Sequence, residues 1–241
     1  MTEAPERDLF NLFIYNNMKK ILLLGLFSLF TVAMNAQIMW AGELESYAKE
    51  KFSDKWVETA EKLAPQLPLD KNNALNYTKV IQAPGKTKAQ LFLLVNYWYA
   101  CNFNAGDASI LLTDKDAGLI IGKGDVSDIA TYTAATNSYT VNLAPIIRTD
   151  IKEGKIRVTY TVPFFEVEKS VGGGLISAMG VGKSVNVGEK WTLDNCFPYS
   201  DKDLRKKTSA KAIVMAHAFS GVVMDKIEEA IKNDILKTEN W

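Results

Sequence analysis

The sequence has little histidine or cysteine and no excess of either charge. One histidine and two cysteines do not complete a four-ligand structural zinc site without carboxylates, so neither a metal nor another cofactor is predicted. Lys+Arg and Asp+Glu each total 28, and the first 36 residues carry three of each, so removing them leaves the balance unchanged. A neutral chain has no overall field to attract nucleic acid or anionic lipid, although local patches stay possible.

The sequence also lacks an apolar run long enough to cross a bilayer. The run Ile21–Ala33 is shorter than the roughly 20 residues of a transmembrane helix but fits the about 7–15 of a secretory signal. Lys19 and Lys20 form a basic region before it. We therefore expect cleavage near Ala36, although Met34, at position −3 from the cleaved bond, is larger than the small residue that is usual there.

Two alternatives to a secretory signal in this segment are a buried core helix and a membrane anchor.

A signal normally begins its own chain, so Met18 rather than Met1 is a candidate start. No cysteine closely follows the apolar run, which argues against a lipid-modified N-terminus. The expected mature protein has no transmembrane span and is periplasmic or secreted.

Cys101 and Cys196 both follow the expected cleavage site. An oxidising compartment permits a disulfide between them. Cys101, however, lies in a strongly apolar stretch, where a free thiol commonly acts as a small buried hydrophobe. The sequence leaves both possibilities open.

With an apolar content of 47%, the 241 residues predict one or two globular domains. Apolar spacing indicates one helix over Glu43–Ala64, in an N-terminal helical segment 37–66, and β-branched character predicts a strand over Leu75–Gln82. A second helix follows Thr87, which is spaced from Gln90 as in a capping box. Its inner stripe is Leu91, Leu94, Val95 and Trp98. Further apolar residues suggest that its other face is covered too, with the terminal helix as a candidate cover: Phe92, Leu93, Tyr97 and Tyr99.

Two hairpins are predicted next. The first joins Ser109–Thr113 to Leu119–Gly124, and the second joins Ile146–Ile151 to Ile156–Val162 through the turn 152–155. Residues 166–190 are rich in glycine and predict a long loop or insertion. The segment 191–241 completes the domain with a helix over Ala212–Leu236, whose stripe is Ala216, Phe219, Val223, Ile227, Ala230 and Ile231.

These elements predict an α+β fold, an antiparallel sheet of about five strands with helices packed on one face. Part of the chain resembles the DUF4468 family of exported Bacteroidetes proteins, which is described as having a fold like the TATA-binding protein (TBP). The resemblance covers residues 67–165 and is carried by these segments: Leu67–Asp70, Tyr77–Val80, Pro84–Lys88, Tyr97-Trp98 and, most specifically, Asp114–Gly124. It implies an envelope location and no reaction, and therefore no catalytic residues. The N-terminal helix and the glycine-rich segment 171–188 depart from the family pattern.

The fold name does not lead us to predict nucleic-acid binding. A minor-groove binder needs a basic concave sheet that neutralises phosphates, and this chain is neutral and expected to be exported. The segment Gly180–Ser184 imitates the end of a phosphate-binding loop. Ser177 stands where that motif requires a glycine, so we prefer a flexible glycine loop.

Three polar side chains are weaker candidates. His217 lies beside the apolar stripe of the terminal helix, and we interpret it as a boundary histidine at the edge of the core rather than a general base. Asp114 and Asp116 are candidate calcium ligands or paired carboxylates. Lys115 between them and Gly118 after them favour a hairpin turn instead.

The sequence therefore predicts a non-enzymatic envelope protein that binds an unknown envelope protein or a small ligand. No catalytic, cofactor-binding or metal-binding residue is assigned from the sequence. One rival is a periplasmic hydrolase, which requires His217 near a serine or cysteine in a cleft. Another is a small-ligand carrier, which requires an enclosed cavity between sheet and helices.

Overall fold

A computed structural model describes residues 38–102, 110–172, 179 and 185–233. The predicted signal segment and the segment Gly180–Ser184 lie outside these residues. The described residues all belong to one compact unit, Gln37 to Trp241. None of the helices described there is long and apolar enough to cross a membrane.

The first sheet has five antiparallel strands in the order β1-β7-β6-β3-β2. In β6 and β7 every second residue is buried, and all of these except Thr149 are apolar, while their neighbours are exposed or half-buried. Its strands are β1 (Leu75–Gln82), β2 (Ile110–Asp114), β3 (Leu119–Lys123), β6 (Ile146–Lys152) and β7 (Lys155–Val162).

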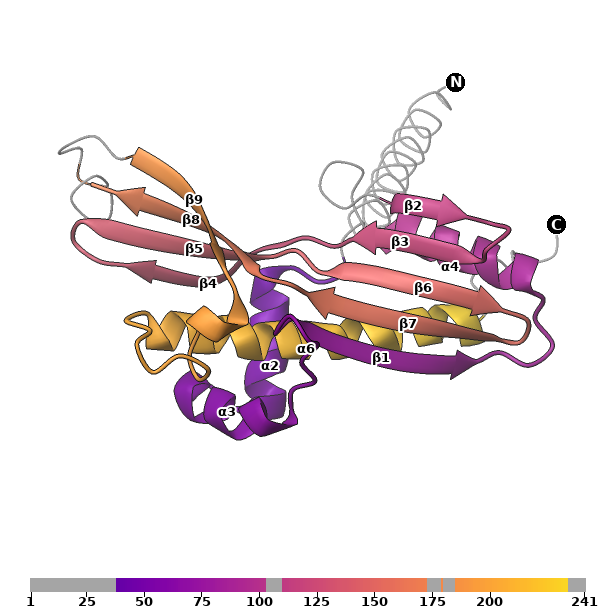
Figure 1. The fold of residues 1–241 in the computed structure, drawn as a ribbon, viewed down its shortest axis with the longest axis horizontal. Helices are drawn as coiled ribbons and strands as arrows, with labels where there is room; N and C mark the ends of the chain where they lie inside the picture. The colour runs from indigo at the N-terminus through magenta and orange to yellow at the C-terminus, as the bar shows by residue number, and fades with distance from the viewer. Residues whose placement is uncertain (1–37, 103–109, 173–178, 180–184, 234–241) are drawn as a thin grey trace, which may run out of the picture. The chain divides into compact units, whose positions relative to one another are not determined.

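The second sheet has four antiparallel strands in the order β4-β5-β8-β9. They are β4 (Val126–Thr133), β5 (Asn137–Leu143), β8 (Phe165–Val171) and β9 (Val185–Trp191). The chain crosses between the sheets three times, at residues 124–125, 144–145 and 163–164 (Figure 1). Pro145 and Pro163 stand at two of the crossings, and because proline has no N–H to donate, the ladder is interrupted there.

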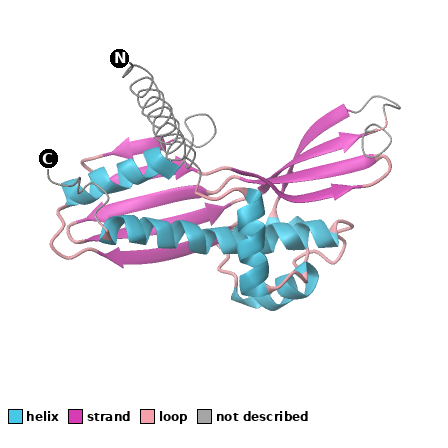
Figure 2. Cartoon of the chain, turned by 180° about the vertical axis from the view of Figure 1, so that it is seen from behind, coloured by secondary structure: helices cyan, strands magenta, loops and turns pink. Residues whose placement is uncertain are grey.

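The helices lie on one side of the five-stranded sheet: α4 (Lys88–Asn102) and α6 (Lys206–Lys232) are behind the strands in Figure 1 and in front of them in Figure 2. Helix α6 contacts strands of both sheets. The helices α2 (Ala41–Phe52) and α3 (Trp56–Leu63), followed by the 3₁₀ turn Ala64–Gln66, pack on α6.

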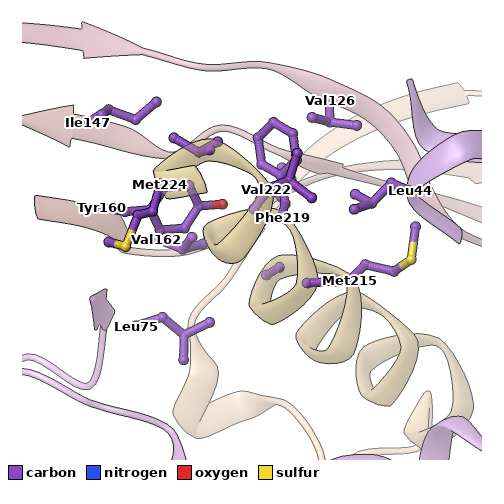
Figure 3. Packing of buried hydrophobic residues seen from close by; sticks show 14 of the residues in the cluster. Leu44, Leu75, Val126, Ile147, Tyr160, Val162, Met215, Phe219, Val222 and Met224 are labelled. Carbon is purple, nitrogen blue, oxygen red and sulfur yellow. The ribbon is translucent and has the colours of Figure 1, made fainter. Parts of the chain in front are cut away.

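One continuous core lies between the sheets and the helices. Phe219 projects from α6 toward Tyr160 of the sheet, with 6.3 Å between the ring centroids, and Met215 projects toward Leu44 of α2 (Figure 3). All six residues of the predicted terminal stripe are buried. Burying a large apolar side chain stabilises the fold by about 1.5–3 kcal/mol, so α6 is the main source of cohesion between the two sheets.

The structure confirms the α+β fold with a five-stranded antiparallel sheet and helices on one face. The strand at Leu75–Gln82 has the predicted bounds. The capping box is present as well, because the backbone N–H of Thr87 donates to Gln90 Oε1 at 2.9 Å and that of Gln90 donates to Thr87 Oγ1 at 3.2 Å.

The single helix predicted over Glu43–Ala64 is wrong. The chain breaks at Ser53, whose φ of 106° is incompatible with a helix, and it restarts at Trp56. The long loop predicted over 166–190 is wrong at both ends, because β8 and β9 occupy them. The four-stranded sheet was not predicted.

The prediction that both faces of α4 are covered is also wrong. Its inner stripe and Tyr99 are buried, and α6 packs beside it. Leu93 and Tyr97, in contrast, are 59% and 45% exposed. Cys101 is a free thiol, the first of the two possibilities that the sequence left open being absent, and it is exposed on the same helix.

Two buried tyrosines of this core form a matched pair for testing. The Tyr99 hydroxyl donates to the carbonyl of Ile147 at 2.9 Å, whereas the Tyr160 hydroxyl has no partner in the described structure. We expect Tyr99→Phe to lower the free energy of unfolding by about 1 kcal/mol and Tyr160→Phe to leave it unchanged or raise it, since an unsatisfied buried hydroxyl is costly. Urea denaturation measures both. A Tyr160→Phe variant less stable than Tyr99→Phe would contradict this packing.

Candidate functional site

His217 lies on α6 at the edge of the core, half-buried and facing β1. Its Nδ1 is 2.8 Å from the hydroxyl of Tyr77, and its ring centroid is 5.1 Å from that of Phe52. The hydroxyl of Ser220 donates to the backbone carbonyl of His217 at 2.7 Å and does not bond the ring. This environment is the boundary position expected from the sequence.

Burial, followed by the positive charge of Lys51, lowers the pKa of His217. Burial also raises the pKa of Tyr77, so the pair is neutral at pH 7. A shallow hollow nearby is lined by Lys51, Phe52 and six other residues of α2, α3 and the segment joining them, and His217 is not among them. The ring is thus held by a tyrosine rather than aimed at a serine or cysteine.

The two cysteines do not meet. Both are free, with Cys101 exposed and Cys196 buried. Burial, with the nearby carboxylate of Asp203, raises the pKa of the Cys196 thiol to about 12. A thiol with so high a pKa is a poor nucleophile at neutral pH.

Asp114 and Asp116 belong to the turn of the first hairpin. Asp114 Oδ1 accepts the backbone N–H of Ala117 at 2.8 Å, and Gly118 has the positive φ of 71° that the turn requires. A Cβ at Gly118 would lie 2.5 Å from the carbonyl oxygen of Ile151. Within the described ranges, no three His, Cys, Asp or Glu side chains are grouped so as to hold a metal ion.

A polar surface set apart from the helices is the outer face, defined here as the face of the five-stranded sheet opposite α4 and α6. Register places side chains from all five strands on it in rows, such as Val80, Arg157, Asp150 and Leu119. None of these side chains is buried, and Val80 is 53% exposed. The outer face carries two carboxylates, Asp114 and Asp150, against five cations: Lys123, Arg148, Lys152, Lys155 and Arg157.

Asp150 organises a cluster of charged side chains on this face, near the β6–β7 turn. Arg148 donates to both carboxylate oxygens, from Nη2 at 2.7 Å and from Nε at 3.1 Å. Arg157 donates to Oδ2 from Nη2 at 3.0 Å and from Nε at 3.2 Å. These bonds, led by that from Arg148, hold the pKa of Asp150 below its usual range. One carboxylate therefore fixes two guanidinium groups in place.

A hollow of about 210 Å³ adjoins this cluster, and we call it the hairpin hollow. Lys152 and Lys155 face each other across the last pair of the β6–β7 hairpin and both line it. Neither lysine has an ion-pair partner within 4.0 Å among the described residues. The remaining lining residues are Val80, Asp150, Ile156 and Arg157.

The sequence reasoning did not select these residues. The turn expected at 152–155 already contained both lysines, and Arg157 was one of the polar residues that alternate along the strand after it, which was the available signal. What was missing was the knowledge that none of the described helices packs on this side of the sheet. Lys123 on the same face pairs with Glu166 at 3.1 Å, so the unneutralised charge is local to the hairpin and does not form a track along the sheet.

Part of the chain is similar to a known family. Residues 77–164 match the model of DUF4468, a domain of unknown function with a TBP-like fold. This confirms the predicted resemblance over a segment slightly shorter than 67–165. No curated protein matches the chain.

Two crystal structures are similar to this chain. One is a TBP-like protein from Parabacteroides distasonis, with a TM-score of 0.47 and 10% identity over 69% of this chain and 97% of that one. The other is a DUF4468 family protein from Bacteroides ovatus, with a TM-score of 0.42 and 16% identity over 67% of this chain and 90% of that one.

The geometry around His217 makes a prediction that needs no knowledge of function. A histidine with a lowered pKa stabilises the fold fully above its unfolded value of about 6.5, and this stability is lost as the pH falls toward the folded value. The chain has one histidine, so its NMR titration is unambiguous. We expect a midpoint below 6.5 in the native protein. A midpoint above 6.5 would mean that a carboxylate stabilises the imidazolium, as in a catalytic pair, and would contradict this account.

Proposed function

We propose that the protein is an exported, non-enzymatic binding module of a Bacteroidetes bacterium, and the match of residues 77–164 to the DUF4468 model supports this proposal. Its binding surface is the outer face of the five-stranded sheet, and its partner is an envelope protein or a small ligand. The mature chain begins near Gln37 and works in the periplasm or outside the cell.

The observation that carries this proposal is the coverage of the sheet on one side only. In the described part of the chain, α4 and α6 pack on one face and no helix packs on the other. The outer face mixes exposed apolar side chains such as Val80 and Ile146 with oriented cations. Such a mixture, apolar contact area with a few fixed polar groups, is typical of surfaces that bind.

The two rival functions lack comparable support. A hydrolase would need His217 free to act on a nucleophile, but its ring is hydrogen-bonded to Tyr77 under Phe52. A carrier would need space between sheet and helices. Large side chains fill that region, and Tyr160, Phe165 and Phe219 are all less than 2% exposed (Figure 3).

Export is supported by the sequence pattern of Lys19, Lys20 and the apolar run that follows them. The free state of both cysteines is compatible with it, since an oxidising compartment permits a disulfide only where two thiols come within reach.

Native mass spectrometry of the protein from its own cell envelope tests this function. We expect a chain that starts near Gln37 and carries an additional non-covalent mass. Thr159 lies at the centre of the outer face, paired with Thr78 and Arg148, so Thr159→Tyr should displace the bound mass by obstruction.

Ser46→Tyr is the matched control, because Ser46 is exposed on α2 and the substitution adds the same ring. It should retain the bound mass, as should His217→Gln. A bound mass that survives Thr159→Tyr would show that the surface lies elsewhere, and an uncleaved start would contradict export.

A further inference from the structure

We propose that the hairpin hollow binds a phosphate-monoester group, with Lys152, Lys155 and Arg157 as its ligands. The inference rests on the proposed function, because it assigns a ligand class to one corner of the outer face. Its first support is the pairing of Lys152 with Lys155 directly across the hairpin. Like charges opposite each other destabilise a strand pair, so an anion between them would relieve a cost that the protein bears alone.

The acidic residue of the turn does not relieve this repulsion. Glu153 lies in the same turn, between the two lysines in sequence. Its Oε2 accepts the backbone N–H of Lys88 at 3.0 Å, at the start of α4, where a negative charge is favoured by the helix dipole. The fold thus directs the one carboxylate of the turn to the helix and leaves the lysine pair unneutralised.

The second support is the presentation of Arg157. Asp150 is shared between two arginines, so it neutralises only one of their two charges. The side chain of Arg157 is still 56% exposed, while that of Asp150 is 20% exposed beneath it. A guanidinium held by its carboxylate partner loses less conformational entropy on binding a ligand, and its planar fork suits an oxyanion.

Charge and size favour phosphate over a carboxylate. The charged side chains that line the hollow, three cations and one carboxylate, sum to two positive charges. A phosphate monoester carries about −1.5 to −2 at pH 7, so it matches that sum, whereas a carboxylate would leave one charge uncompensated. The hollow of about 210 Å³ far exceeds the about 10–15 Å³ that one water molecule needs, so it has room for a tetrahedral group.

The test is isothermal titration calorimetry with inorganic phosphate at low ionic strength, with chloride as the reference anion. Lys152→Met/Lys155→Met keeps the aliphatic volume and removes both charges. We expect phosphate affinity to fall at least about tenfold, the effect of losing one charge-assisted hydrogen bond. The melting temperature of this variant should be equal to or above that of the native protein, because the repulsion is gone.

Lys207→Met/Lys226→Met is the matched control. Both residues are exposed on α6, so the variant has the same net charge but an intact hollow. It should bind phosphate like the native protein. Equal loss in the two double variants would show that only net charge matters and would overturn the inference, as would the absence of phosphate binding to the native chain.

A second arm identifies the source of the phosphate group. Phosphatidylcholine vesicles with phosphatidic acid present a phosphomonoester headgroup, and vesicles without it do not. Co-sedimentation only with the former, reversed by inorganic phosphate, would indicate a lipid. Phosphate binding without co-sedimentation would indicate a soluble phosphate ester. If phosphate fails to bind while Thr159→Tyr still displaces the native bound mass, this inference fails and the proposed function stands.

Discussion

The structure depends on the packing of one long helix across two sheets. Helix α6 buries apolar residues along its whole length, from Ala210 near its start to Ile231 near its end. The chain passes between the two sheets at three points, and α6 contacts strands of both sheets. Since this helix, with α4, α2 and α3 beside it, supplies the apolar cover on that side, the opposite face of the five-stranded sheet keeps polar and charged side chains. The surface that we assign to binding is a consequence of where the core lies.

Strand register determines which charged side chains lie next to one another on the outer face. A shift of one residue in β6 against β7 would send Asp150 and Arg148 to the core side and would separate the lysines of the hairpin. The observed register instead places one carboxylate between two arginines and leaves two lysines opposed. Neither arrangement adds much to the stability of the fold. Exposed ion pairs such as those of Asp150 contribute about 0–1 kcal/mol, and the opposed lysines repel each other. Groups that stability does not require are reasonable candidates for function.

Sequence reasoning succeeded where local patterns agree with the fold. It found β1 from its β-branched and aromatic residues, β7 from the strict alternation of apolar and polar residues, and the capped start of α4 from a local motif. It failed over 43–64, because Phe52, Trp56 and Ala60 keep helical spacing through a break that is made by the backbone of Ser53. It missed β9 because most of that strand is exposed on both faces, which removes the hydrophobic alternation, and Gly188 suggested a loop. The charges of the hairpin hollow were visible in the sequence, but the side of the sheet that the helices cover is a tertiary property.

We propose above that this protein binds through the outer face of the five-stranded sheet, at its β6–β7 corner. Chemical-shift mapping of the backbone amides during a titration with inorganic phosphate tests it most directly. We expect saturable chemical-shift changes concentrated around the hairpin hollow, at residues 150–157 and at Val80 on the neighbouring strand. Shifts concentrated on α2, α3 or α6, or spread evenly over the surface without saturation, would contradict it.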